Sequence, residues 1–311
     1  MSVSTQIRVG VVGLGQWGQH HVRIYHHLPG VTLAGIADSA PRAVGAFARR
    51  YNIPGYRDHR MLFGQVDAVS IVVPTALHYE IAREFLQHGV HVLVEKPITT
   101  TVEQAADLVD LAQRRGVALL VGHVERFKPA VQALRELVTD PLFVQVRRVR
   151  PWNPRRVMDV GVVLDLMIHD LDIILTLMRT PVVRVSAIGA AIHGEDEDLA
   201  VAHLALRRGC LASFVASRVS PVKAAELEIT LPDGLIHLNY LSQQITIQRH
   251  GTLRRTVVKG EEPLRAELTH FVECVRGNAM PLVSGEDGQR ALEVAKEILT
   301  KMTLITPHVA V

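Results

Sequence analysis

Two ionisable side chains, Asp165 and His169, stand four positions apart in a segment, residues 161–172, that is otherwise mostly apolar. If the segment is helical, this spacing puts both on one face. Burying a carboxylate and an imidazole among apolar residues is costly unless they pair or face a cavity. A histidine beside a carboxylate is also a good proton acceptor near neutral pH. The spacing predicts a proton-transfer pair; the alternatives are a self-satisfied buried pair and a metal site that adds Asp172.

A lysine, Lys96, follows the apolar run of residues 91–95 and precedes Pro97. If the run is a strand of a parallel sheet, Lys96 stands at its carboxyl end, where ligands bind in open α/β sheets. A lysine there can hold a substrate hydroxyl and stabilise a developing alkoxide. The alternative is an exposed lysine paired with Glu95. Pro97 fixes the chain direction and is a candidate for a cis peptide bond.

A glycine motif, Gly13-x-Gly15-x-x-Gly18, lies between the apolar run of residues 7–13 and a predicted helix that extends to about residue 28. Gly13 permits a tight turn, Gly15 lets the backbone approach a pyrophosphate, and Gly18 allows close packing of helix on strand. The helix N-terminus then offers free N–H groups to phosphates. The motif predicts nucleotide binding; the alternative is a purely structural turn.

Asp38 ends the second apolar run, residues 31–38. A carboxylate at this place accepts hydrogen bonds from the hydroxyls of the adenosine ribose and repels a 2′-phosphate, so it favours NAD over NADP. Arg42 is near enough in sequence to accommodate that phosphate instead. Asp38 is also a candidate N-cap for a helix that starts at Ala40, and the two roles are compatible.

Strands and helices alternate over the first part of the chain, which is typical of a doubly wound parallel sheet. The predicted strands are residues 7–13, 31–38, 66–73, 91–95 and 117–122, with helices at 40–51, at 78–88 and from the capping box at Thr101 to just before Gly116. We therefore expect an α/β domain over residues 1–122.

A different pattern follows, which predicts an α+β domain over residues 123–283 with a large, mainly antiparallel open sheet. Its predicted elements are a helix at 127–139, a strand at 142–149, a helix at 160–178, and then successive strands with turn signals at 207–209, 232–234 and 249–251. The last helix, residues 286–302, has Ser284 as a candidate cap, and we expect the segment 284–303 to pack back on the first domain.

The composition excludes several classes of protein. The chain has 311 residues, 48% of them hydrophobic, and a net charge of only +3, which fits a globular enzyme and gives no basic surface for nucleic acid. Its two cysteines, Cys210 and Cys274, cannot form a disulfide framework and suit a reducing cytoplasm. The N-terminus lacks the features of an export signal, and no apolar run is long enough to span a bilayer. We expect a cytoplasmic protein with no nucleic-acid or membrane partner.

A cofactor motif followed by a lysine, a carboxylate and an imidazole predicts a dehydrogenase that acts on an alcohol. With these motifs the chain resembles the glucose–fructose oxidoreductase/inositol dehydrogenase (Gfo/Idh/MocA) family along nearly its whole length. The resemblance is carried by the glycine turn, by Val73-Pro74-Thr75 with His78, by Glu95-Lys96-Pro97, by Gly122-His123 and by Asp165-x-x-x-His169. It implies a Rossmann domain and proton transfer by Lys96 and His169, assisted by Asp165. It also implies NAD as cofactor and a proline, Pro97, that is often cis.

The resemblance extends to a substrate. Residues 122–129 and 159–170 are similar to those of family members that act on UDP-N-acetylglucosamine, which implies oxidation of its 3-hydroxyl ahead of a transamination towards amide-linked lipid A. Such members often carry a run of glycines before the catalytic helix, whereas this chain has only Gly161. The expected cofactor-binding residues are Gly13, Gly15, Gln16, Trp17, Gly18, Asp38, Ser39, Arg42, Pro74, Thr75, His78, Glu95, Lys96 and Pro97.

A cluster of arginines supports a nucleotide-sugar. Arg147, Arg148, Arg150, Arg155 and Arg156 are interleaved with Trp152 and Asn153. Guanidinium groups suit a diphosphate, and Trp152 could stack on uracil. The alternative is a solvated strand edge with a loop, and because a strand alternates its faces, not all five arginines can point into one site. The expected substrate-binding residues are His123, Arg126, Arg148, Arg150, Trp152, Arg155 and Arg156.

Two other functions fit the same motifs. One is an inositol or simple-sugar dehydrogenase; the other is a non-catalytic NAD-binding sensor, against which the intact set of Lys96, Asp165 and His169 argues. We also expect a homodimer or homotetramer. The predicted antiparallel sheet carries apolar residues (Val201, Leu204, Leu206, Leu211, Phe214 and Val215), and a second apolar face would need cover.

Overall fold

The computed structural model describes residues 6–154 and 159–306. The chain forms two compact units. The first consists of the chain up to Val124 together with Glu262–Gln289, and the second consists of Glu125–Glu261 together with the chain from Arg290 onward. The expected domains were residues 1–122 with 284–303, and residues 123–283; the units differ in that residues 262–283 belong to the first and residues from 290 onward to the second.

The first unit is built on a six-stranded sheet in the order β3-β2-β1-β4-β5-β6, with every neighbouring pair parallel. The strands are β1 (Ile7–Val12), β2 (Val31–Ala37), β3 (Gly55–Tyr56), β4 (Ala68–Ile71), β5 (His91–Glu95) and β6 (Leu119–Gly122). The order reverses between β1 and β4, and ligands of such sheets bind at the carboxyl ends of the strands beside this switch point.

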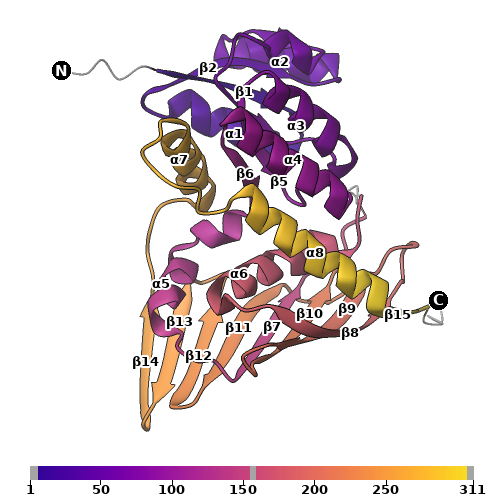
Figure 1. Cartoon of the computed structure of the whole chain (residues 1–311), viewed down its shortest axis with the longest axis vertical. Coiled ribbons are helices and arrows are strands. Elements are labelled where there is room, and N and C mark those ends of the chain that lie inside the picture. Colours follow the sequence, from indigo (N-terminus) through magenta and orange to yellow (C-terminus); the bar gives the residue numbers. More distant parts are fainter. Residues whose placement is uncertain (1–5, 155–158, 307–311) are drawn as a thin grey trace. The chain divides into compact units, whose positions relative to one another are not determined.

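Helices connect and cover these strands (Figure 1). They are α1 (Gln16–His27), α2 (Pro41–Tyr51), the 3-10 turns η1 (His59–Leu62) and η2 (Thr75–Leu77), α3 (His78–Gln87), α4 (Val102–Arg115) and α7 (Pro263–Val275). Val9 and Val11 of β1 are fully buried in one core cluster with Tyr25 of α1 and Phe271 of α7. The parallel sheet is confirmed, but α7 has no counterpart in the expected elements.

The second unit is built on a nine-stranded sheet in the order β14-β13-β12-β11-β7-β10-β9-β8-β15. The strands are β7 (Phe143–Val149), β8 (Val182–Ala190), β9 (Leu199–Leu206), β10 (Leu211–Ser217), β11 (Ala224–Leu231), β12 (Gly234–Asn239), β13 (Gln244–Arg249), β14 (Thr252–Val257) and β15 (Met302–Ile305). All pairs are antiparallel except β7 with β10 and β8 with β15. The expected large, mainly antiparallel sheet is confirmed.

One face of this sheet is buried. Ala212, Phe214 and Ala216 of β10 are almost inaccessible, whereas the alternating Ser213 and Val215 are partly exposed. Figure 1 shows α5 (Pro129–Leu137) and α6 (Ile168–Met178) along one side of the sheet. The remaining helical segments are η3 (Val124–Phe127), η4 (Val163–Met167) and α8 (Gly285–Lys301), the last with residues in both units.

Local signals in the sequence set the ends of several helices. Thr101 accepts a hydrogen bond from the Gln104 N–H at the start of α4, and α4 ends at Gly116 with a φ of +66°. Ser284 accepts from the Asp287 N–H, so the predicted cap of the last helix is confirmed. Among the described residues, no helix combines the length and apolar character that crossing a membrane requires.

Candidate active site

The glycine turn connects β1 to α1 at the switch point of the first unit. Gly13 has a φ of +95°, and a Cβ on it would lie 2.2 Å from the Val72 carbonyl oxygen. A Cβ on Gly18 would come within 1.9 Å of the Gly13 carbonyl oxygen, so both glycines are required by close backbone contact. Gly15, by contrast, has no atom within 4 Å of an added Cβ, and no side chain caps α1. The helix N-terminus is therefore open to a phosphate ligand.

Asp38 follows β2 and fixes the neighbouring turn. Its two carboxylate oxygens accept hydrogen bonds from the backbone N–H of Leu14, at 2.6 Å, and of Ala40, at 2.8 Å. A carboxylate has about four acceptor positions, so capacity remains for ribose hydroxyls. The second contact is a local bond at the start of α2, which fits the expected dual role. Ser39 and Arg42 are exposed beside it, as are Gln16 and Trp17 at the glycine turn.

Glu95 and Lys96 stand at the carboxyl end of β5, and the peptide bond between Lys96 and Pro97 is cis, as the resemblance implied. The Glu95 carboxylate lies 3.3 Å from His21 Nε2 and accepts a hydrogen bond of 3.3 Å from the Lys96 backbone N–H. Burial would raise the pKa of Glu95, but its contact with His21 and the charges of Lys96 and His78 hold that pKa below its ordinary value. Glu95 is therefore ionised inside the unit.

Sequence reasoning missed His21. It is fully buried on α1, where it contacts the Glu95 carboxylate. Gly122 leaves room for that carboxylate, because a Cβ on Gly122 would lie only 2.9 Å from it. The signal that could have found it is its place one helical turn after Gly18, on the face of α1 that packs against the sheet.

His78 opens α3 and is 1% exposed. Its Nδ1 lies 2.8 Å from the Pro97 carbonyl oxygen and its Nε2 lies 2.9 Å from the Val73 carbonyl oxygen. Of the other expected cofactor-binding residues, Pro74 is exposed and Thr75 is buried. The ring of His78 therefore contacts the two loops that follow β4 and β5 through their backbone.

In the second unit the segment 161–172 is helical throughout most of its length, as expected, but its first part differs. Val163–Met167 forms a π-helical turn, with hydrogen bonds between residues five apart, before α6 begins at Ile168. Such turns are often found at functional sites. From Gly161 to Asp170 every residue is buried except His169, which is partly exposed. His169 is thus the one residue of this stretch that is not fully buried.

Three carboxylates of this segment each bind one arginine. Asp165 accepts a hydrogen bond of 2.7 Å from Arg150, Asp170 binds Arg148 through two bonds of 2.7 and 2.8 Å, and Asp172 binds Arg126 through two bonds of 2.6 Å. These three arginines were all expected to bind the substrate. In the structure each of the three pairs with a carboxylate of the helical segment that carries His169.

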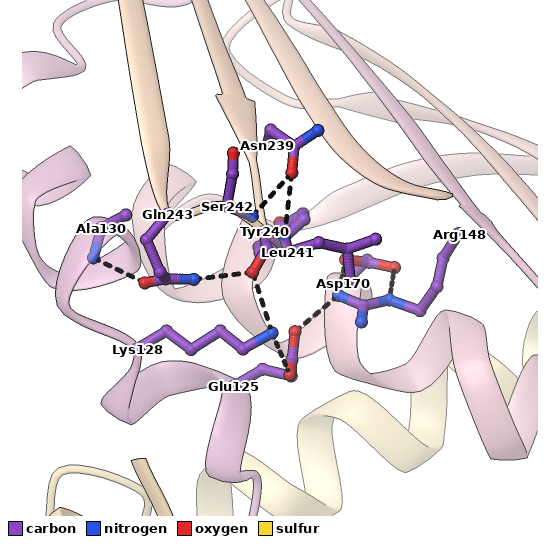
Figure 2. A network of polar contacts seen from close by, with 10 residues as sticks. All are labelled: Glu125, Lys128, Ala130, Arg148, Asp170, Asn239, Tyr240, Leu241, Ser242 and Gln243. Atoms are coloured by element: carbon purple, nitrogen blue, oxygen red, sulfur yellow. Dashed lines mark hydrogen bonds and ion pairs between the residues drawn. The ribbon is translucent and has the colours of Figure 1, made fainter. Parts of the chain in front are cut away.

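Arg148 belongs to a larger buried network, which Figure 2 shows. Glu125 accepts bonds from Arg148, at 2.9 Å, and from Lys128, at 2.7 Å. Lys128 also donates to the Tyr240 carbonyl oxygen, and the Arg148 guanidinium lies 4.8 Å from the centre of the Tyr240 ring. Burial opposes the charge on Arg148, but Asp170 and Glu125 raise its pKa well above the ordinary value. The network joins η3, β7, α6 and the turn after β12.

Of these three arginine–carboxylate pairs, Arg126–Asp172 is the most deeply buried, with side chains only 3% and 1% exposed. Arg147, on the opposite face of β7, is exposed, so the expected alternation of the cluster is confirmed for Arg147 and Arg148. Arg155 and Arg156 lie outside the described residues.

The other expected substrate-binding residues differ in their surroundings. Trp152 stacks on His193 with ring centres 4.0 Å apart, and the Arg218 guanidinium lies 5.6 Å from the centre of its ring. Asn153 is exposed on the same loop. His123, which follows β6, is completely buried. Trp152 is thus already stacked against a ring of its own unit.

Glu197, in the loop before β9, holds the start of the π-helical turn, and sequence reasoning missed it. Its carboxylate accepts a hydrogen bond of 2.9 Å from the Val163 N–H, and its carbonyl oxygen accepts one of 3.0 Å from Val162. A Cβ on Gly161 would lie 2.2 Å from that carboxylate. The single glycine before the segment is therefore needed for Glu197 to reach the helix end. Burial raises the pKa of Glu197. Among the described residues, no three His, Cys, Asp or Glu side chains gather as metal ligands.

A parallel sheet with an open glycine turn at its switch point, a carboxylate after its second strand and a lysine after its fifth defines a nucleotide-binding α/β oxidoreductase. Residues 7–123 match the model of the oxidoreductase family with an NAD-binding Rossmann fold, and residues 131–237 match the GFO/IDH/MocA C-terminal domain. The chain belongs to this family, and its cofactor is a nicotinamide dinucleotide.

Two curated relatives cover nearly the whole chain. The chain is 32% identical to UDP-N-acetylglucosamine 3-dehydrogenase from Acidithiobacillus ferrooxidans over 94% of its own length and 96% of the relative's. A solved structure of that enzyme superposes with a TM-score of 0.91 over 96% of this chain and 98% of the other. The chain is also 27% identical to scyllo-inositol 2-dehydrogenase (NAD(+)) from Bacillus subtilis, over 93% and 92% of the two chains.

Proposed function

We propose that this protein oxidises the 3-hydroxyl of UDP-N-acetylglucosamine to the 3-oxo sugar, with NAD as cofactor. The observation that carries the proposal is the 32% identity to UDP-N-acetylglucosamine 3-dehydrogenase over almost the entire length of both chains. The three groups expected to move protons, Lys96, Asp165 and His169, are all present in this chain. The proposed product is a ketone, which a transaminase can convert to an amine. This agrees with the step towards amide-linked lipid A that the resemblance implies.

In the proposed mechanism, oxidation of the alcohol removes a proton from oxygen and a hydride from carbon. Bound nicotinamide supplies the hydride acceptor. His169 takes the hydroxyl proton, and it is the one partly exposed residue in the otherwise buried stretch from Gly161 to Asp170. Asp165, held by Arg150 at 2.7 Å, adds a negative charge on the same segment that favours the imidazolium. Lys96 holds the hydroxyl oxygen and stabilises the alkoxide as the proton leaves.

The preference for NAD is part of the proposal. Asp38 accepts two backbone hydrogen bonds and so is fixed with its negative charge beside the glycine turn. This charge would repel the 2′-phosphate of NADP. Arg42, exposed nearby, could oppose the effect.

For the substrate diphosphate we propose Arg155 and Arg156, and for the base we propose Trp152. Arg126 and Arg148 we assign instead to the architecture of the second unit, because the same nitrogen atoms that a diphosphate would need already bind Asp172, Asp170 and Glu125. Arg150 we assign to Asp165. This assignment narrows the substrate-binding set that the sequence predicts.

A second candidate function is that of an inositol dehydrogenase, because the scyllo-inositol enzyme matches over 93% of the chain. It would use the same Lys96 and His169 and would have no need of groups for a nucleotide. A non-catalytic sensor would need neither residue.

The test is a comparison of His169→Ala and Lys96→Ala with the wild type, in the formation of NADH from UDP-N-acetylglucosamine. Removal of a positioned acid–base group lowers turnover by about 100- to 10,000-fold. NAD affinity should be kept in His169→Ala, because His169 belongs to the second unit and is not among the expected cofactor-binding residues. The controls are His250→Asn and Lys259→Ala, at exposed positions on β13–β14 and after β14, which should behave as wild type. If His169→Ala keeps most of its turnover, the assignment of the base is wrong.

A further inference from the structure

His78 makes two short contacts that a neutral histidine cannot satisfy together. Its ring lies in the interior of the first unit between the loops after β4 and β5, with Nδ1 2.8 Å from the carbonyl oxygen of Pro97 and Nε2 2.9 Å from that of Val73. Both partners are backbone carbonyl oxygens, which only accept hydrogen bonds. A neutral imidazole has one N–H donor and one acceptor nitrogen, whereas the imidazolium has two donors.

With a neutral ring, one nitrogen lone pair would face a carbonyl oxygen at less than 3 Å, and a buried acceptor would lose its partner. We propose that His78 is a buried imidazolium that ties the loop after β4 to the loop after β5 and thereby positions Lys96. The role in turnover rests on the proposed function of Lys96, but the protonation state of His78 does not.

A buried cation needs a compensating charge, and Glu95 provides it. His78 is the first residue of α3, where the positive end of the helix dipole works against a cation. The ionised Glu95 is the neighbouring anion, and the charge of His78 is one of the influences that hold the pKa of Glu95 low. Lys96 and His21 are the other titratable groups that act on Glu95. His21 contacts the carboxylate at 3.3 Å from the side of α1.

Glu95 and His78 together hold the chain on both sides of Lys96. On one side the Glu95 carboxylate accepts a bond from the Lys96 backbone N–H, and on the other side His78 holds the carbonyl oxygen of Pro97. The contacts of Glu95 and His78 thus fix the backbone of Lys96 from both sides. Without them the backbone, and with it the lysine ammonium, would shift. A displacement of about 1 Å at a reacting group can cost about 100-fold in rate.

The first test is the ring-nitrogen NMR spectrum of the full-length protein labelled with 15N-histidine, at a pH about two units above the ordinary histidine pKa of about 6.5. The chain has 16 histidines, so the signal is assigned by its absence from the spectrum of His78→Gln. The expected result is a ring with both nitrogens protonated, which becomes neutral in Glu95→Gln. A neutral ring at His78 would overturn the proposal. If His78→Gln does not fold, the wild type is compared with Glu95→Gln alone. The proposal is then overturned if the wild-type spectrum contains no doubly protonated ring, or if no such ring becomes neutral in Glu95→Gln.

The second test separates positioning from simple loss of folded protein. We expect His78→Gln to lower kcat by about 10- to 100-fold per correctly folded molecule. The sequence placed His78 among the cofactor-binding residues, but its ring is buried against backbone carbonyl oxygens, so the positioning role predicts a smaller effect on the Kd of NAD than on kcat. The matched control is His59→Gln in the same unit, because His59 is a partly buried histidine that contacts Glu84 at 2.7 Å. An unchanged kcat in folded His78→Gln would refute the positioning role. If the wild type oxidises no UDP-sugar, the proposed function fails while the NMR result still decides the state of His78.

Discussion

Substitution of Arg126 tests whether this arginine stabilises the second unit or binds the substrate. Its side chain is 3% exposed and that of Asp172 is 1% exposed, and two bonds of 2.6 Å join them. Arg126→Met leaves the Asp172 carboxylate in the interior without its arginine. Breaking a buried pair in this way costs about 3–5 kcal/mol, whereas replacing both partners with apolar residues is often neutral or stabilising. The double variant with Asp172→Leu should therefore recover most of the loss.

The assay is urea unfolding of the four proteins of this cycle, without cofactor. The denaturant slope grows with chain size and is about 3 kcal/mol per molar at the upper end of the usual range, so the single variants should unfold at roughly 1–2 M less urea than the wild type. The double variant should unfold close to the wild type. Steady-state kinetics on the same proteins provide the comparison with substrate binding.

Two results would refute this reasoning. The first is a loss of less than about 1 kcal/mol in Arg126→Met, because an uncompensated buried carboxylate costs more than that. The second is a large rise in the KM for UDP-N-acetylglucosamine in a variant whose stability is unchanged. That outcome would return Arg126 to the substrate-binding set.

Three further predictions follow from the same structure. Asp38→Ala should narrow the preference for NADH over NADPH measured by fluorescence titration, and a wild type that binds NADPH more tightly would show that the carboxylate does not set the preference. Gly161→Ala should cost about 1–3 kcal/mol in urea unfolding and lower kcat, because its Cβ would lie 2.2 Å from the Glu197 carboxylate; Gly194→Ala, where nothing lies within 4 Å, is the control. The sheet of the second unit, with Leu211 55% exposed, should pair in a dimer or tetramer by light scattering, and a monomer at micromolar concentration would contradict this.

Local patterns predicted most of the fold. The alternation of apolar runs with helical segments located the parallel sheet, and the capping residues Thr101 and Ser284 located helix starts, because both kinds of signal depend on residues close in sequence. The helix α7 was missed although Leu264, Leu268 and Phe271 have helical spacing and Pro263 suits the first turn. The sequence therefore contains the signal for this helix.

The partners of the arginines could not be predicted in the same way. Arg148 pairs with a residue 22 positions away, and Arg126 with one 46 positions away. Sequence spacing gives no information about such contacts, and an arginine near a proposed site fits a phosphate as well as a carboxylate. The π-helical turn at Val163–Met167 was equally out of reach, because a shift of hydrogen bonds by one residue leaves the apolar pattern unchanged.

The proposed substrate is tested most directly by the rate of NADH formation at equal concentrations of UDP-N-acetylglucosamine, free N-acetylglucosamine and scyllo-inositol, followed by identification of the oxidised carbon. The account predicts turnover with UDP-N-acetylglucosamine alone, a 3-oxo product, and loss of both in His169→Ala. Turnover with scyllo-inositol and none with the UDP-sugar would contradict it and establish the second candidate function.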